Sequence, residues 1–189
     1  MYKRQVHNSG KRTRTVAVET VLVDAGDVPV KRVSQQVKLQ AGESKTVRQR
    51  FAVRNPKLWS PDSPYLYRIQ SRVKAGHEVL DGGVTRVGIR KAEFKGKDGF
   101  WLNGKPFGQL VGANRHQDFA YVGNALPNSQ QWRDAKRLRD AGCTIIRVAH
   151  YPQDPAFMDA CDEMGLFVIV ATPGWQYCCL LYTSPSPRD

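Results

Sequence analysis

Three short apolar runs alternate with two helix-like stretches in the second half of the chain, and this order constrains the fold more than any other feature. The apolar runs lie at 109–113, 144–148 and 166–170, and the stretches 129–141 and 155–164 between them have the apolar spacing of amphipathic helices. Strands connected through helices by short links run parallel with right-handed crossovers. The order predicts a parallel sheet, as in a (β/α)-barrel.

Capping residues set the expected ends of the two helices. Asn128 is placed to cap the first helix and Gly142 to follow its last turn. Asp154 is placed to cap the second helix, which is expected to stop at Gly165. The apolar run 166–170 after it is continuous, which predicts a strand buried on both faces.

The first half of the chain has the pattern of an antiparallel β-sandwich. Apolar residues alternate with polar ones in short runs, and turn signals separate the runs, among them Asp81-Gly82-Gly83. Trp59 and Tyr67 are expected in the core of this sandwich, and Asn103-Gly104 predicts a later hairpin. The expected strands lie at 16–23, 33–39, 47–53, 65–69 and 84–89.

Polar side chains gather where two of the parallel strands are expected to end. His116 and Asp118 follow the first of these strands, and Arg147 and His150 lie at the end of the second. In a (β/α)-barrel the carboxyl edge of the strands is where catalytic and binding residues lie. These four residues are therefore candidates for a functional site.

Six motifs in a fixed order resemble glycoside hydrolase family 2, the family of β-galactosidases, β-glucuronidases and β-mannosidases. The likeness spans residues 15–176. Each motif is weak alone, and their common order and spacing make the resemblance specific. The motifs are LWSPDSPYLY at 58–67, GIR at 88–90, FWLNGKP at 100–106, GANRHQD at 112–118, IRVAHYP at 146–152 and CDEMGL at 161–166.

The resemblance implies an immunoglobulin-like antiparallel β-sandwich at 6–92, followed at 93–178 by the first three βα units of a (β/α)₈ TIM barrel. Retaining members hydrolyse β-glycosides with two glutamates on later barrel strands. Both would lie beyond the end of this chain, so we expect an inactive fragment of a β-galactosidase-like enzyme. The alternative is a noncatalytic carbohydrate-binding or scaffold module.

The resemblance also implies roles for five residues. Arg147 is similar to the family arginine beside the nucleophile, where a guanidinium keeps a carboxylate ionised. His150 and Asp118 are similar to residues that contact the sugar. His116 either contacts the sugar or braces its loop. Trp175 either stacks on a pyranose face or packs under the barrel rim.

The two ends of the chain, 1–5 and 179–189, resemble translated sequencing adapter. Tyr2-Lys3-Arg4-Gln5 can be encoded by TATAAGAGACAG, and the reverse complement of this sequence reads into a coding sequence for 179–189. Such segments are excluded from fold reasoning. The alternative for the second segment is a Pro/Ser-rich disordered tail.

The composition of the chain limits the classes of binding partner that we expect. The net charge of +12 comes from Lys and Arg scattered along strand-like segments, which favours a solvated face over a nucleic-acid surface. No apolar run has membrane-spanning length, so no membrane partner is expected. Of the four cysteines, Cys143 and Cys161 are expected to be free buried thiols, and no metal or cofactor is expected. The compartment and any homo-oligomer of a longer parent protein stay open.

Overall fold

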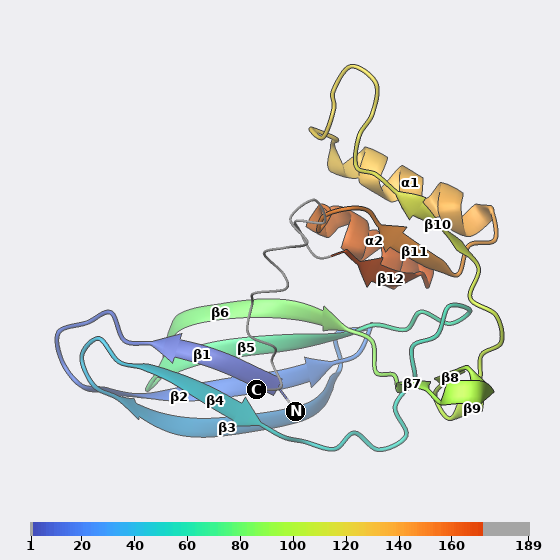
Figure 1. Ribbon diagram of the computed structural model, residues 1–189. Helices are drawn as coiled ribbons and strands as arrows, with labels where there is room; N and C mark the ends of the chain where they lie inside the picture. The colour runs from blue at the N-terminus through green and yellow to red at the C-terminus, as the bar shows by residue number, and fades with distance from the viewer. Residues whose placement is uncertain (1, 172–189) are drawn as a thin grey trace. The chain divides into compact units, whose positions relative to one another are not determined.

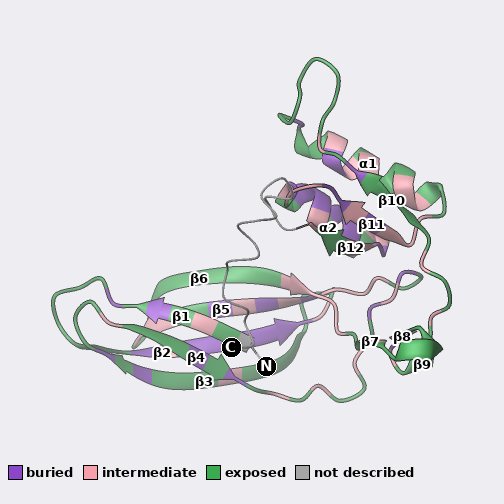
Figure 2. Ribbon diagram, in the orientation of Figure 1, coloured by how far each residue is buried: buried purple, intermediate pink, exposed green. Residues whose placement is uncertain are grey.

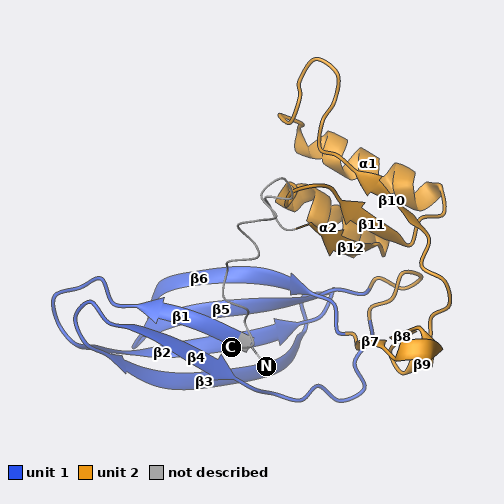
Figure 3. Ribbon diagram, viewed as in Figure 1, with its two compact units in different colours: residues 1–58, 65–89 blue, residues 59–64, 90–189 orange. Residues whose placement is uncertain are grey.

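The computed structural model describes residues 2–171, which form two compact units (Figure 3). The first unit contains residues 1–58 and 65–89, and the second contains residues 59–64 and everything from 90 onward. The first is an antiparallel β-sandwich, and the second contains parallel strands in alternation with helices, so the predicted fold class is confirmed. The domain boundaries at 92/93 and at both chain ends stay predictions.

Two antiparallel sheets make up the first unit (Figure 1). The larger has the strand order β3-β2-β5-β6, and the smaller pairs β1 with β4. Their strands are β1 (Tyr2–His7), β2 (Arg14–Val23), β3 (Pro29–Leu39), β4 (Ser44–Gln49), β5 (Tyr67–Ala75) and β6 (Glu78–Val87).

Buried residues of both sheets form the core of this unit, and they are concentrated on β2 (Figure 2). Tyr67 is buried beside Leu22 and Ile69, so its predicted core position is confirmed. A further cluster gathers residues from β1 to β4, and its members are Val6, Val16, Val18, Val37, Leu39 and Val47.

Two strand ends differ from the sequence-based expectation. Gly82 and Gly83 lie inside β6, opposite β5, and the chain turns instead at Gly76. A Cβ at Gly82 would come within 3.0 Å of the Ser71 carbonyl oxygen, so this glycine permits close strand approach rather than a turn. β4 ends at Gln49, four residues before the end of the apolar run.

The buried carboxylate of Glu19 makes the stability of the sandwich depend on pH. The Lys74 ammonium lies 3.0 Å away and Arg32 lies 3.3 Å away. The hydrogen bond from Lys74, more than any other cause, lowers the pKa of Glu19. A lowered folded-state pKa stabilises the fold above the unfolded pKa of about 4.3, and this stabilisation is lost as the pH falls through the folded value.

We therefore expect Glu19→Gln to flatten the loss of sandwich stability below roughly pH 4.3. Residue-resolved hydrogen exchange of the β2 and β5 amides as a function of pH measures this dependence. Glu78→Gln, at an exposed position of β6, is the matched control. If the unmodified chain, Glu19→Gln and Glu78→Gln lost stability equally as the pH falls, Glu19 would not be the source of the pH dependence.

The second unit carries a parallel sheet with the order β10-β11-β12, which α1 and α2 connect (Figure 1). The three strands are in register, with Asn114 opposite Arg147 and Arg147 opposite Ile169. A small antiparallel sheet of β7, β8 and β9 precedes it. The bounds are β7 (Ala92–Phe94), β8 (Phe100–Leu102), β9 (Lys105–Pro106), β10 (Gly112–Arg115), α1 (Asn128–Asp140), β11 (Ile145–Val148), α2 (Pro155–Met164) and β12 (Phe167–Val170).

The ends of α2 agree with the sequence-based expectation, and the start of α1 does not. The Asp154 side chain accepts a hydrogen bond from the Ala156 amide at 2.7 Å, and α2 stops before Gly165. Asn128, the expected cap of α1, is instead its first helical residue. Pro127 takes the cap position and supplies no side-chain hydrogen bond.

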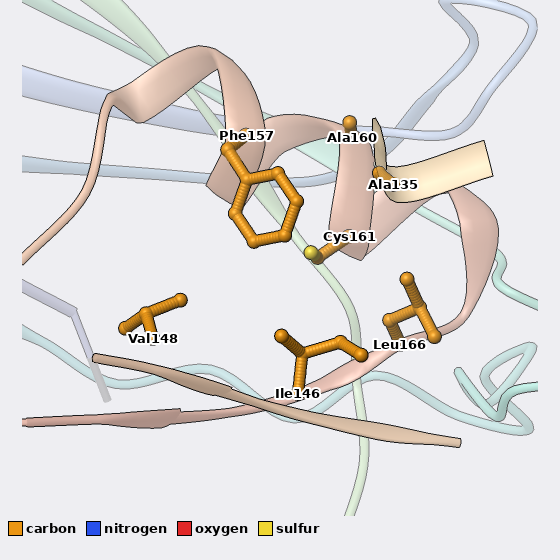
Figure 4. Packing of buried hydrophobic residues seen from close by; sticks show 7 residues of the cluster. All are labelled: Ala135, Ile146, Val148, Phe157, Ala160, Cys161 and Leu166. Atoms are coloured by element: carbon orange, nitrogen blue, oxygen red, sulfur yellow. The ribbon is translucent and has the colours of Figure 1, made fainter. Parts of the chain in front are cut away.

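The two helices bury one face of the parallel sheet (Figure 4). Phe157 and Cys161 of α2 pack against Ile146 and Val148 of β11, and all four are almost fully buried. Burial raises the pKa of the Cys161 thiol to about 12, so this cysteine stays protonated and unreactive at neutral pH. Cys161 and Cys143 are both free, but only Cys161 is buried as predicted, since Cys143 is half-buried. Cys178 and Cys179 lie outside the described residues.

The opposite face of the sheet is open near Ile169 in the part of the chain that the structure describes, whereas aromatic rings pack on Phe167 at the start of β12. Ile169 of β12 is 51% exposed, so the expectation that this strand is buried on both faces is wrong for residues 2–171. The helices cover only the side that carries Ile146 and Val148. Arg147 lies on the open side, in register with Asn114 and Ile169.

Trp59 belongs to the second unit and not to the sandwich core, where it was expected. Its indole Nε1 donates a 2.8 Å hydrogen bond to the Asp162 carbonyl oxygen of α2. Its ring contacts Phe167 of β12 edge-to-face, with 5.3 Å between centroids. The Asn103 amide of the β8–β9 turn donates to the Trp59 carbonyl oxygen at 3.0 Å. Residues 59–64 therefore leave the sandwich and pack on the barrel segment.

Candidate functional site

Arg147, His150 and His116 lie together at the carboxyl edge of the parallel sheet. Arg147 is the third residue of β11, and His150 follows two residues after the strand ends. The two terminal nitrogens of Arg147 lie 3.5 and 3.4 Å from Nδ1 of His150. The His116 and His150 rings meet edge-to-face, 5.2 Å apart and at 74°. Three residues predicted from the sequence thus form one cluster, here called the edge cluster.

The other two candidate residues are not placed in the edge cluster. Asp118 lies exposed in the loop after β10, and no hydrogen bond or ion pair within residues 2–171 includes its carboxylate. Trp175 lies outside the described residues. Its predicted stacking role is therefore a proposal with no geometry attached.

Gln117 holds the two loops that carry the histidines, and sequence reasoning missed it. Its side-chain oxygen accepts a 2.6 Å hydrogen bond from the Asp154 amide at the start of α2. Its own amide donates to the Tyr151 hydroxyl at 3.2 Å, and that hydroxyl reaches Asn124 at 3.4 Å. Gln117 immediately follows His116, so these bonds fix the loop after β10 against the loop after β11.

Arg115, the last residue of β10, holds the loop after β11 and the helix α1 together through its guanidinium. Its guanidinium is almost fully buried and pairs with Asp134 of α1 at 2.7 Å. It also donates to Gln131 at 2.8 Å and to Gln153 at 2.6 Å, and it lies 4.0 Å above the Phe157 ring. This burial and these contacts give Arg115 a structural role.

The Arg115 partners were not identified from the sequence, although one signal was present. Gln131 is fully buried within the inward face of α1, one turn before Ala135. A polar residue in an apolar stripe needs a hydrogen-bonding partner. Gln153 completes the arrangement by donating to the Arg115 carbonyl oxygen at 2.6 Å.

The donors and acceptors of the edge cluster suit oxygen-rich ligands. Arg147 offers only donors, and each neutral imidazole offers one donor and one acceptor. Among residues 2–171 no three His, Cys, Asp or Glu side chains gather as metal ligands would. Within the same residues no helix is both long and apolar enough to span a bilayer. The chemistry of the cluster suits hydroxyl or carboxylate oxygens.

Two family models match this chain in the order in which the two units occur. The model described as glycosyl hydrolases family 2 matches residues 2–90, and the model of that family's TIM barrel domain matches residues 93–180. The chain belongs to glycosyl hydrolase family 2. Residues of the edge cluster thus fall at the carboxyl edge of a family 2 barrel sheet.

Similar proteins include named β-galactosidases and β-glucuronidases. A β-galactosidase of Thermoanaerobacter pseudethanolicus is 43% identical over 134 residues, which are 70% of this chain and 18% of that protein. The crystal structure of a family 2 member from Bacteroides cellulosilyticus has a TM-score of 0.88 at 33% identity, covering 95% of this chain and 25% of its own. A Bacteroides uniformis β-glucuronidase has a TM-score of 0.84 at 30% identity, covering 90% and 21%. The family 2 chain described here thus spans about a fifth of its curated relative.

Proposed function

We propose that this chain is part of a retaining β-glycosidase of the β-galactosidase type. The observation that carries the proposal is the edge cluster, in which Arg147, His150 and His116 converge at the carboxyl edge of the family 2 barrel sheet. Retaining glycosidases need two carboxylates about 5–5.5 Å apart. Within residues 2–171 the edge cluster contains no carboxylate, so both catalytic groups would come from a longer parent protein.

The three residues have separate proposed roles. The Arg147 guanidinium would hold a neighbouring nucleophilic carboxylate in its ionised form. His150 would donate to a sugar hydroxyl whose contacts tighten in the oxocarbenium-like transition state. His116 packs edge-to-face against the His150 ring and would keep it in place. Asp118, in the loop after β10, and Trp175 would contact the sugar.

A chimera tests this proposal directly. Residues 93–171 replace the matching segment of the Thermoanaerobacter β-galactosidase, and hydrolysis of nitrophenyl β-galactoside and β-glucuronide is measured. We expect an active chimera in which His150→Ala lowers kcat/KM roughly 10²-fold, about 2.7 kcal/mol, because one transition-state donor is lost.

Lys97→Ala, at an exposed position of the same segment, is the matched control and is expected to leave kcat/KM within about twofold. A folded chimera without activity, or one indifferent to His150→Ala, would contradict the proposed site. Extending the open reading frame from its source DNA is the independent check. Absence of two glutamates at the ends of downstream barrel strands would favour a noncatalytic carbohydrate-binding module.

A further inference from the structure

In the contact between Arg147 and His150, only the arginine can donate the hydrogen bond. A guanidinium has five N–H donors, no acceptor, and stays protonated at every physiological pH. Both of its terminal nitrogens approach the same ring atom, Nδ1 of His150, at 3.5 and 3.4 Å. Nδ1 can therefore take part in this contact only as an acceptor, with its lone pair facing the arginine.

We propose that Arg147 is a positioning residue that selects the Nε2–H tautomer of His150. The tautomer of a histidine is set by the hydrogen bond that one ring nitrogen makes. With Nδ1 facing a permanent donor, the ring proton resides on Nε2. His150 then presents an N–H donor on the side of the ring away from Arg147.

The surroundings keep His150 in the orientation that this tautomer requires. The backbone of β11 holds Arg147 in register between Asn114 of β10 and Ile169 of β12. The His116 ring packs edge-to-face on His150 and limits its rotation. Rotating the His150 ring by a half turn would replace Nδ1 with a C–H group, which accepts nothing from the guanidinium.

The consequence for ligand binding rests on the proposed function. A fixed Nε2–H group recognises an acceptor oxygen, such as a lone pair of a sugar hydroxyl or a carboxylate, and cannot accept a proton from the ligand through that nitrogen. His150 would thus act as a hydrogen-bond donor and not as a general base. The tautomer itself follows from the contact with Arg147 and not from the ligand.

Long-range ¹H–¹⁵N NMR of the imidazole rings tests the inference in the full chain at pH 8, where an unperturbed histidine is neutral. A free ring exchanges between tautomers and gives averaged nitrogen shifts, and the exposed His77 is the internal reference. We expect His150 to show the limiting pattern, with an unprotonated Nδ1 and a protonated Nε2. Averaged shifts, or a protonated Nδ1, in the unmodified chain would overturn the inference.

Two substitutions separate positioning from simple structural support. Arg147→Met keeps the length of the side chain without its donors and is expected to return His150 to the averaged shifts of His77. Arg147→Lys keeps a donor and is expected to restore the limiting pattern. Unchanged His150 shifts in Arg147→Met would also overturn the inference. Addition of galactose to the β-galactosidase chimera is read separately, because a failure to shift the Nε2 resonance there counts against the proposed function and leaves the tautomer in place.

Discussion

Arg115→Met is expected to lower the free energy of unfolding of the second unit by about 3–5 kcal/mol. The substitution removes the cation from a buried pair and leaves the Asp134 carboxylate without its 2.7 Å partner. It also removes the donors that reach Gln131 and Gln153. Groups that lose their partners while still buried retain the full cost of leaving water.

Urea unfolding followed by tryptophan fluorescence measures this loss specifically. Every tryptophan among residues 2–171 belongs to the second unit, namely Trp59, Trp101 and Trp132. Arg133→Met is the matched control, because Arg133 is exposed on α1 and, among residues 2–171, hydrogen-bonds only to Gln130, at 3.3 Å. The control is expected to change stability by about 0.5 kcal/mol or less. A loss below about 1 kcal/mol for Arg115→Met would show that the pair is not an anchor.

Gly165→Ala is the second substitution with a large expected effect. Gly165 ends α2 in the left-handed conformation, with φ of 73°, and a Cβ there would overlap the Pro61 carbonyl group. The left-handed conformation alone costs a non-glycine residue about 1–2 kcal/mol, and overpacking adds about 1–3 kcal/mol. We expect a total loss of roughly 3 kcal/mol or more.

Gly142→Ala separates the two causes. Gly142 follows α1 with φ of 84°, and a Cβ there would meet nothing within 4 Å. This control is expected to lose only the conformational term, about 1–2 kcal/mol. Thermal unfolding of both variants by tryptophan fluorescence gives the difference. Equal losses of stability in the two variants would mean that the segment carrying Pro61 can move aside without cost and does not pack tightly on α2.

Elements with a strong local signal could be predicted from the sequence. The helix α2 has an apolar stripe, an aspartate cap and a glycine stop, and all three are found at the expected residues. The weak cap of α1 was misassigned because Asn128 can serve in the first turn as well as before it. The position of Gly82 within β6 could not be predicted, because the sequence alone does not distinguish a glycine that forms a turn from one that allows close strand approach.

Contacts between distant segments could be predicted only where the topology itself implies them. Parallel strand order brings the ends of β10 and β11 together, so the meeting of His116 with His150 followed from the order. The packing of Trp59 on α2 joins residues about a hundred positions apart, and no local pattern indicates it. No local pattern indicates the hydrogen bond between Arg115 and Gln153 either.

The chain crosses between its two units three times, between residues 58 and 59, 64 and 65, and 89 and 90. Gene shuffling at a single junction near residue 92 would therefore transplant an incomplete module. The recipient would inherit the barrel strands without Trp59 and Pro61, and the donated sandwich would carry those residues as an exposed apolar appendage. Recombination keeps both modules intact only when the sandwich and the barrel segment are transferred together, or when residues 59–64 are transferred with the barrel segment.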